Sequence, residues 1–339
     1  MWTRSMFRPV KIKVVGIGGG GCNAITRMVR EQIGGVEFIA LNTDTRHLSV
    51  TEAPLRIALG ERYTHGSGAG GDQYLGRKCA EDSLEEIKAA LAGSDMVFLA
   101  AGMGGGTGTG AIPLVAEAAK QGGALTVAIV TRPFHFEGRR RLEVADAGIS
   151  QLINNVDTLI IVPNDRLLDF PHPRTSLDAT FKLADEILCH AVQTITELIM
   201  VPGLINIDFA GVKTVMAKAG PAWMSMGRGS GQTPAEEAAR EALKSPLLDV
   251  SINSATRVLL HITGGGKLTL SQVNSAAGII HETVHPEANI IFGVNIDLNM
   301  LDEVRMTLIA AGFAAQEKFV LASMNRNTAP FLMGLKSPR

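Results

Sequence analysis

The chain has 339 residues, of which 46% are hydrophobic and 19% charged, and its formal net charge is −1. This composition excludes a largely disordered chain, and the near-neutral charge gives no general attraction for nucleic acid or for an anionic membrane. The three cysteines, Cys22, Cys79 and Cys189, show neither a disulfide framework nor metal-type spacing, which indicates a reducing compartment. No apolar run reaches the roughly 18–20 residues that span a bilayer, so we expect a cytoplasmic protein with no direct membrane insertion and no nucleic-acid partner.

The first half of the chain alternates apolar, strand-like runs with helix-like segments. We expect strands at 11–17, 36–41, 95–101, 125–131 and 158–162, and helices at 23–30 and 111–120. Continuous apolar strands separated by helices predict a parallel sheet that is covered on both faces. Ligands of such sheets bind beyond the carboxyl ends of the strands, which is where the glycine-rich loops of this chain fall.

One long helix and a smaller unit follow. Apolar residues at three- and four-residue spacing predict a helix from 176 to about 200, which Pro202 and Gly203 end. Beyond it we expect strands at 255–263, 290–296 and 304–311, with a helix near 270–282 between the first two. The predicted fold is α/β, with an N-terminal extension at 1–10, a parallel-sheet domain at 11–175, a central helix at 176–201, a smaller α/β C-terminal domain at 202–315 and a short irregular tail at 316–339.

Two glycine-rich loops point to the chemistry. Residues 16–21 follow the first strand and match G-x-G-x-x-G, a pattern that also suits an NAD-dependent oxidoreductase or a tight turn that binds nothing. The acidic residue expected about 20 positions later falls instead in the polar turn Asn42-Thr43-Asp44. The second loop, GGGTGTG at 104–110, offers free backbone N–H groups, two hydroxyls and the positive end of a helix dipole. With no G-x-x-x-x-G-K-[ST] in the chain, we expect a phosphate site without the lysine of P-loop enzymes.

The sequence GGGTGTG is the signature of the tubulin and FtsZ family, and the chain resembles bacterial FtsZ from about residue 11 to residue 313. Further matching stretches are VEFIALNTDT, VTRPFHFEGRRR, VDTLIIVPNDRLL and HITGGGKLTL, which begin at residues 36, 130, 156 and 261. The resemblance implies a GTPase domain of tubulin/FtsZ type, a long central helix and a smaller C-terminal domain. It also implies GTP and GDP as ligands, Mg²⁺ as cofactor and head-to-tail assembly into cytoskeletal filaments at the bacterial division septum.

The resemblance assigns the phosphate side of the nucleotide site by position. The turn with Asn42 and Asp44, together with Gly70 and Gly71, would lie near the γ-phosphate and its Mg²⁺, and no other metal ligand is expected. Cys22 belongs to the first loop and stands where relatives commonly have glycine. The remaining loop residues assigned to the phosphates are Gly19, Gly20, Gly21, Gly105, Gly106, Thr107, Gly108 and Thr109.

The ribose and base sides are assigned in the same way. Glu137 and Arg141 would lie on the ribose and phosphates, although four-residue spacing equally suits an exposed ion pair worth about 0.3–0.5 kcal/mol. Phe181 and Asp185 share one face of the central helix, so a ring can stack on guanine while a carboxylate accepts its N–H donors; the alternative is a core Phe beside a solvated Asp. The residues assigned to the base are Asn23, Asn164, Phe181 and Asp185.

The loop that activates water departs from the family pattern. Relatives supply it from the next subunit, with the sequence N-x-D-x-x-D, whereas residues 206–211 here read NIDFAG. Asn206 and Asp208 are in place, but Gly211 stands at the position of the second carboxylate. Because loss of one such positioned group commonly costs on the order of 10²–10⁴ in rate, we expect weakened GTP hydrolysis. The alternative is that Gly211 is tolerated and leaves adequate activity.

The partner predictions follow from the same comparison with the family. Self-assembly is the first expectation, and a second FtsZ homologue that supplies the missing carboxylate is an alternative partner. In that case the chain would be a regulatory or structural paralogue that co-assembles with an active filament. Relatives usually carry a C-terminal peptide that binds membrane-anchoring adaptors. The segment APFLM at 329–333 matches that peptide poorly, so adaptor binding is not predicted.

Overall fold

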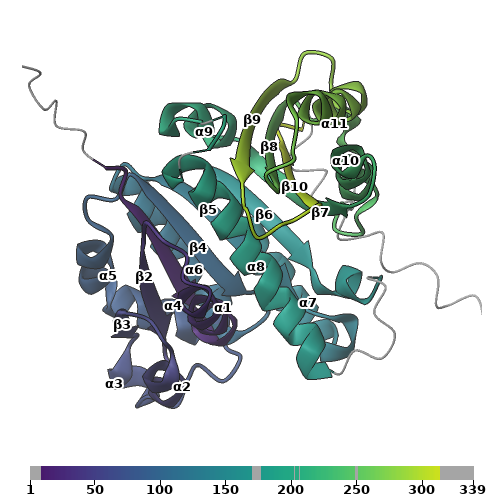
Figure 1. Ribbon diagram of the computed structural model, residues 1–339. Helices are drawn as coiled ribbons and strands as arrows, with labels where there is room; N and C mark the ends of the chain where they lie inside the picture. Colours follow the sequence, from purple (N-terminus) through teal and green to yellow (C-terminus); the bar gives the residue numbers. More distant parts are fainter. Residues whose placement is uncertain (1–8, 170–176, 202, 206, 249–250, 314–339) are drawn as a thin grey trace, which may run out of the picture.

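The computed structural model describes residues 9–169, 177–201, 203–205, 207–248 and 251–313. These residues form a ten-stranded sheet in the order β3-β2-β1-β4-β5-β6-β7-β10-β8-β9. Figure 1 shows helix α8 crossing in front of the strands, with α2 and α3 at one end of the ribbon and α9 at the other. Among the described residues, no helix combines the length and the apolar character needed to cross a membrane.

Parallel strands make up the N-terminal part of the sheet. They are β1 (Ile12–Ile17), β2 (Val36–Asn42), β3 (Leu55–Ala58), β4 (Met96–Gly102), β5 (Leu125–Arg132) and β6 (Thr158–Pro163). β1 and β5 are buried along their whole length. Such strands need helices on both faces of the sheet, because neither face meets water.

Helices cover both faces. One face packs against α1 (Gly18–Arg30) and α8 (Leu177–Met200), whose apolar residues share a core with Val14 and Phe98. The opposite face packs against α4 (Gln73–Asp82), α5 (Leu84–Leu91), α6 (Gly106–Gln121) and α7 (Arg139–Leu152). The short helices α2 (Thr45–Val50) and α3 (Glu61–Thr64) connect strands β2, β3 and the glycine-rich turn before α4.

The C-terminal part continues the same sheet with mixed strand directions. Its elements are α9 (Phe209–Met216), β7 (Gly220–Gly229), α10 (Pro234–Lys244), β8 (Arg257–Gly264), α11 (Leu270–Thr283), β9 (Asn289–Ile296) and β10 (Val304–Ala311). β10 runs antiparallel to β7 and β8, whereas β8 and β9 are parallel. The predicted fold class is confirmed, and the predicted tail lies outside the described residues.

A short seam joins the two parts of the sheet. β6 and β7 pair in parallel over only three positions, from Thr158↔Gly220 to Ile160↔Ala222. Asp157, just before β6, accepts hydrogen bonds from the backbone N–H groups of Thr126 (3.0 Å) and Lys218 (3.2 Å) through its two carboxylate oxygens. A buried carboxylate therefore fixes the chain that enters the seam.

The structure corrects the predicted starts of two helices and adds two strands that were not predicted, β3 and β7. α1 and α6 begin inside the glycine loops, at Gly18 and Gly106, rather than at 23 and 111. A Cβ at Gly21 would lie 2.3 Å from the carbonyl oxygen of Ala100, so glycine is needed where the helix meets the sheet. The strand β7 was missed because its sequence, GPAWMSMGRG, lacks the β-branched residues that are typical of strands.

Candidate functional site

A cavity of about 280 Å³ opens at the carboxyl ends of β1 and β4, where α1 and α6 begin. The predicted site residues that line it are Gly19, Gly20, Asn23, Gly105, Gly106, Thr107, Gly108, Glu137, Arg141, Asn164, Phe181 and Asp185. A neighbouring cavity of about 460 Å³ is lined by the predicted Gly70 and Gly71 and shares Gly105, Gly106, Glu137 and Arg141 with the first. Most of the site residues predicted from the sequence therefore line these two adjoining cavities.

Two helix N-termini face the first of these cavities. Neither Ile17, before α1, nor Gly105, before α6, caps its helix with a side chain, so among the described residues the first backbone N–H groups have no side-chain acceptor. Gly18 has a φ of +71°, and a Cβ there would lie 2.8 Å from the backbone nitrogen of Gly108, so the two loops touch. A Cβ at Gly105 would meet no atom within 4 Å. The paired N-termini suit an anion such as a phosphate chain.

Some predicted residues lie beneath the cavity rather than in its walls. The thiol of Cys22 is fully buried and contacts the carbonyl oxygen of Leu41 at 3.9 Å, and burial raises the pKa of this thiol to about 12. Thr109 accepts a 2.8 Å hydrogen bond from the backbone N–H of Gly104, which holds the second loop in shape. The side chains of Cys22 and Thr109 therefore support the two loops from beneath.

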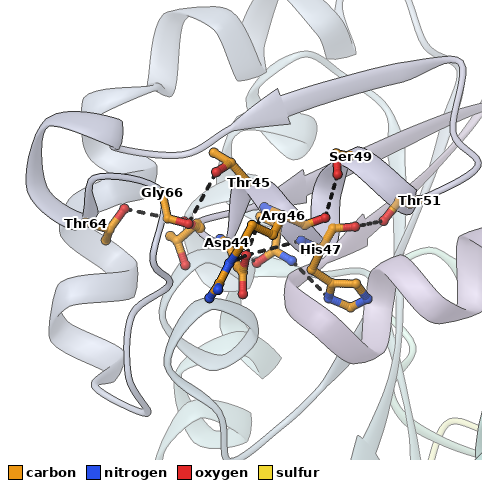
Figure 2. Close-up of polar contacts among 10 residues, drawn as sticks. Asp44, Thr45, Arg46, His47, Ser49, Thr51, Thr64 and Gly66 are labelled. Carbon is orange, nitrogen blue, oxygen red and sulfur yellow. Dashed lines mark hydrogen bonds and ion pairs between the residues drawn. The ribbon is translucent and has the colours of Figure 1, made fainter.

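The turn after β2 is hydrogen-bonded to the second glycine loop. The hydroxyls of Thr43 and Thr107 are hydrogen-bonded at 2.6 Å, which links this turn to the start of α6. Asp44 accepts from the backbone N–H groups of Arg46 (3.0 Å) and His47 (3.1 Å) and so caps α2, as Figure 2 shows. Asn42 and Asp44 do not line the cavity described above, and one carboxylate oxygen of Asp44 is committed to the helix cap.

Glu137 and Arg141 form the ion pair that their spacing allowed, with Arg141 Nη1 and Glu137 Oε2 3.1 Å apart. The pair is not an ordinary surface pair, because the side chain of Glu137 is only 10% exposed. Its other oxygen accepts a 2.8 Å hydrogen bond from the backbone N–H of Phe134. Glu137 is therefore fixed, while the half-exposed Arg141 remains able to turn toward a ligand in the cavity.

The far wall of the cavity presents oxygen acceptors beside an aromatic ring. The Oδ1 atom of Asn164 is buried and has no hydrogen-bond partner among the described residues. Burial raises the pKa of Asp185 from an ordinary value of 3.8 to about 7, against the opposing effect of the nearby Arg27. The Phe181 ring is 39% exposed and rests edge-on against Phe134, with 5.4 Å between centroids. An unpaired buried oxygen and a poorly solvated carboxyl fit a flat ligand whose edge carries N–H donors, as guanine does.

Several wall residues were not predicted. They are Gly102, Met103, Thr131, Pro133 and Ala184. Those at the ends of β4 and β5 could have been found from the rule that ligands of a parallel sheet bind at its carboxyl edge. His47 was also missed; its ring nitrogen Nε2 lies 2.9 Å from Oδ1 of Asn23.

The predicted catalytic loop lies away from the cavity. Asn206 is outside the described residues, and none of the described residues between 203 and 211 lines the cavity. Along α8, the rise from Asp185 to Met200 is about 22 Å, and Figure 1 places α9 at the end of the ribbon opposite α2. Within the described part of the chain, no group of three or more His, Cys, Asp or Glu side chains is arranged to hold a metal ion.

Family models match both parts of the chain. The GTPase domain of the Tubulin/FtsZ family matches residues 11–172, and the C-terminal domain of the FtsZ family matches residues 220–314. An FtsZ dimer from M. jannaschii is 46% identical, with a TM-score of 0.86 over 89% of this chain and 88% of that chain. The chain belongs to the Tubulin/FtsZ family. The predicted family and the predicted GTPase class are thereby confirmed.

Two further solved structures have the same fold. A point mutant of M. jannaschii FtsZ is 45% identical, with a TM-score of 0.87 over 90% of this chain and 92% of that chain. CetZ2 from Haloferax volcanii, solved as a GTPγS-bound protofilament, is 20% identical, with a TM-score of 0.80 over 94% of this chain and 97% of that chain. At that identity the likeness to CetZ2 concerns the fold alone.

Proposed function

We propose that this chain binds GTP in the cavity between α1 and α6 and assembles head-to-tail into filaments. The observation that carries the proposal is the pair of uncapped helix N-termini in the same cavity as Asn164, whose buried Oδ1 atom has no hydrogen-bond partner among the described residues. The first feature suits the triphosphate and the second suits the N–H edge of guanine. No other cavity described above combines the two.

The cavity residues then divide by the part of the nucleotide that they would hold. The two glycine loops would hold the phosphates through backbone N–H groups, with Thr107 adding a hydroxyl. Glu137 and Arg141 would hold the ribose and its neighbouring phosphate. Asn23, Asn164, Phe181 and Asp185 would recognise the base. Mg²⁺ would be held mainly through phosphate oxygens, near Asp44, Gly70 and Gly71, and would neutralise charge on the triphosphate.

Hydrolysis would require a second subunit. Asp208, at the start of α9, does not line the cavity of its own chain, so its carboxylate would reach a triphosphate from the next subunit. Such a head-to-tail contact does not close on itself and yields a filament. The dimer of the related M. jannaschii FtsZ supports self-assembly. With Gly211 in place of the second carboxylate, we propose slow hydrolysis across this interface.

The cellular role follows from the same proposal. We place the filament in the cytoplasm, at the bacterial division septum. Gly211 also favours a second candidate, a regulatory paralogue that co-assembles with a homologue whose loop carries both carboxylates. Adaptor binding through residues 329–333 is not part of the proposal.

The test adds GTP and Mg²⁺ to the purified chain and follows light scattering and phosphate release in the same sample. Scattering with little phosphate release supports the slow polymer, and rapid release with scattering contradicts the slow-hydrolysis part. If the chain alone gives neither signal, it is mixed with an intact FtsZ homologue. A mixture that differs in both signals from the homologue alone favours the paralogue. Binding of NADH in place of GTP would overturn the proposal. An Asp185→Ala variant is the control for binding through the base.

A further inference from the structure

We propose that His47 is a positioning residue for base recognition, because it fixes the amide of Asn23 so that its N–H₂ group faces the nucleotide cavity. The inference rests on the proposed function, since it assigns a role in the same GTP site. His47 lies on α2, outside the two glycine loops, and does not itself line the cavity. Its effect on a ligand would therefore pass through Asn23.

The main chain of His47 is held at both ends of α2. Its backbone N–H donates to the carboxylate of Asp44 at 3.1 Å, and its carbonyl oxygen accepts from the hydroxyl of Thr51 at 2.9 Å. Figure 2 shows both contacts, with the imidazole ring projecting away from them. Thr51 is only 3% exposed, so this end of the helix is buried. These two contacts therefore fix the position of His47, and with it the point from which its ring projects.

The ring bridges two amide side chains. Its Nε2 atom lies 2.9 Å from Oδ1 of Asn23 on α1, and its Nδ1 atom lies 3.4 Å from Nδ2 of Asn42 at the end of β2. It also lies against the first glycine loop, because a Cβ at Gly19 would be 3.4 Å from its Cε1 atom. The imidazole therefore connects a wall residue of the cavity to the turn that contains Asp44.

One backbone N–H group sets the direction of every bond in this series. The N–H of Asp44 donates to Oδ1 of Asn42 at 3.3 Å, so Asn42 must turn its Nδ2 donor toward His47. Nδ1 of His47 then has to accept, which places the ring proton on Nε2. Nε2–H in turn donates to Oδ1 of Asn23. If Asn23 donated to Nε2 instead, the ring proton would have to sit on Nδ1, where it would face the Nδ2 donor of Asn42.

The consequence for the cavity is chemical. With its oxygen occupied by His47, Asn23 offers two N–H donors to the cavity that it lines. Asn164 and Asp185 offer acceptors from elsewhere in the wall. A base that satisfies both must carry N–H donors on one edge and an acceptor on another, as guanine does. Without His47, the Asn23 amide could rotate and present its oxygen to an acceptor of the base.

The test is a double-mutant cycle on GTP affinity, measured by calorimetry on the full chain with Mg²⁺. His47→Ala and Asn23→Ala should each raise the Kd for GTP by about 3- to 10-fold, the range expected for one hydrogen bond. The double variant should bind no more weakly than Asn23→Ala alone, because His47 acts through Asn23. Losses that multiply in the double variant would overturn the inference.

Two matched substitutions separate positioning from a general packing role. The amide of His47→Gln can occupy the place of Nε2 and donate to Asn23, so its Kd should stay within about twofold of the parent, less than one hydrogen bond. His47→Asn reaches only the place of Nδ1, so it should bind as weakly as His47→Ala. Equal losses for Gln and Asn would contradict the inference. Arg46→Ala, on the adjoining, 85% exposed side chain, is the control without contact to Asn23.

The outcomes also separate this inference from the proposed function. If the parent chain does not bind GTP, the proposed function fails. If the parent binds GTP and His47→Ala binds equally well, only the role of His47 fails. Should His47→Ala unfold, as seen by circular dichroism, the cycle is run with His47→Asn, whose amide retains a contact to Asn42.

Discussion

Gly211 donates its backbone N–H to the carboxylate of Asp208 at 2.7 Å. This bond makes Asp208 the N-cap of α9, and it commits one carboxylate oxygen to the helix rather than to a ligand. A Cβ at Gly211 would lie 3.0 Å from Cγ2 of Ile207 and 3.1 Å from Oδ1 of Asp208. A side chain at 211 therefore fits only if these neighbours move by a few tenths of an ångström.

Gly211→Asp tests the proposed slow hydrolysis. Restoring the second carboxylate should raise phosphate release per subunit, under assembly conditions, by on the order of 100-fold or more. Gly211→Ala adds the same Cβ without the carboxylate and should leave the rate near that of the parent. Equal rates for the parent and Gly211→Asp would show that the glycine does not limit hydrolysis.

The affinity for GTP should depend on pH through Asp185. Burial raises the pKa of this carboxyl to about 7, so acidification protonates the group that would accept from guanine. Affinity should be about tenfold lower near pH ~6 than near pH ~8, since one pKa unit corresponds to a factor of ten. Asp185→Asn removes this titration, so the pH dependence that remains in the variant belongs to the phosphates and is subtracted. Identical pH profiles for the two proteins would contradict the prediction.

The same pKa predicts the sign of a stability effect. Because the folded value lies above the ordinary value of 3.8, the folded protein binds the proton more tightly than the unfolded chain. The free energy of unfolding of the nucleotide-free protein should therefore fall as pH rises from about 4 to 7, relative to Asp185→Asn. Urea unfolding at several pH values measures this difference.

Two glycines of the phosphate loops should respond differently to alanine. Gly105 has open space around its Cβ position, so Gly105→Ala should change the melting temperature little and yet weaken GTP binding, because the methyl group enters the cavity. Gly18 has a φ of +71° and a Cβ position 2.8 Å from Gly108, so Gly18→Ala should cost about 1–3 kcal/mol of stability. Thermal unfolding and GTP titration on both variants check this contrast.

The seam between β6 and β7 should depend on Asp157. Asp157→Ala removes the acceptor of two backbone N–H groups, of which that of Thr126 is buried, and should cost about 2–4 kcal/mol. Asp95→Ala is the matched control, because Asp95 accepts one exposed hydrogen bond from the backbone N–H of Lys11 and should cost about 1 kcal/mol or less. Similar losses in the two variants would contradict a special role for the seam.

The fold was predictable where one physical requirement decides the local sequence. β1, β4 and β5 are buried and therefore read as continuous apolar runs, and α8 has regular apolar spacing. β7 was not predicted, because the packing of α10 against it limits its composition. A Cβ at Gly227 would lie 2.1 Å from the carbonyl oxygen of Ala238 in α10. Close packing selected glycine there against strand propensity. Close packing also explains why α1 and α6 begin with glycines, ahead of their predicted starts.

The site was predictable as far as its residues sit in recognisable loops or on one helix face. Gly105 and Thr107 stand in a loop whose composition indicates phosphate binding, and Phe181 and Asp185 share a face of α8. His47 was not predictable in this way, because its contact with Asn23 depends on how the turn after β2 is folded against α1. Cys22 was assigned to the ligand, yet its side chain is buried in the core beneath the loop.

The contact of Trp223 with Phe313 makes the C-terminal unit optically distinct. The two rings meet edge-on with 4.9 Å between centroids, and Trp223 is only 4% exposed. The other tryptophan of the chain, Trp2, lies outside the described residues. A Trp2→Phe variant would therefore emit from one buried indole in β7, next to the seam. Its fluorescence would report when this unit loosens, without any attached dye.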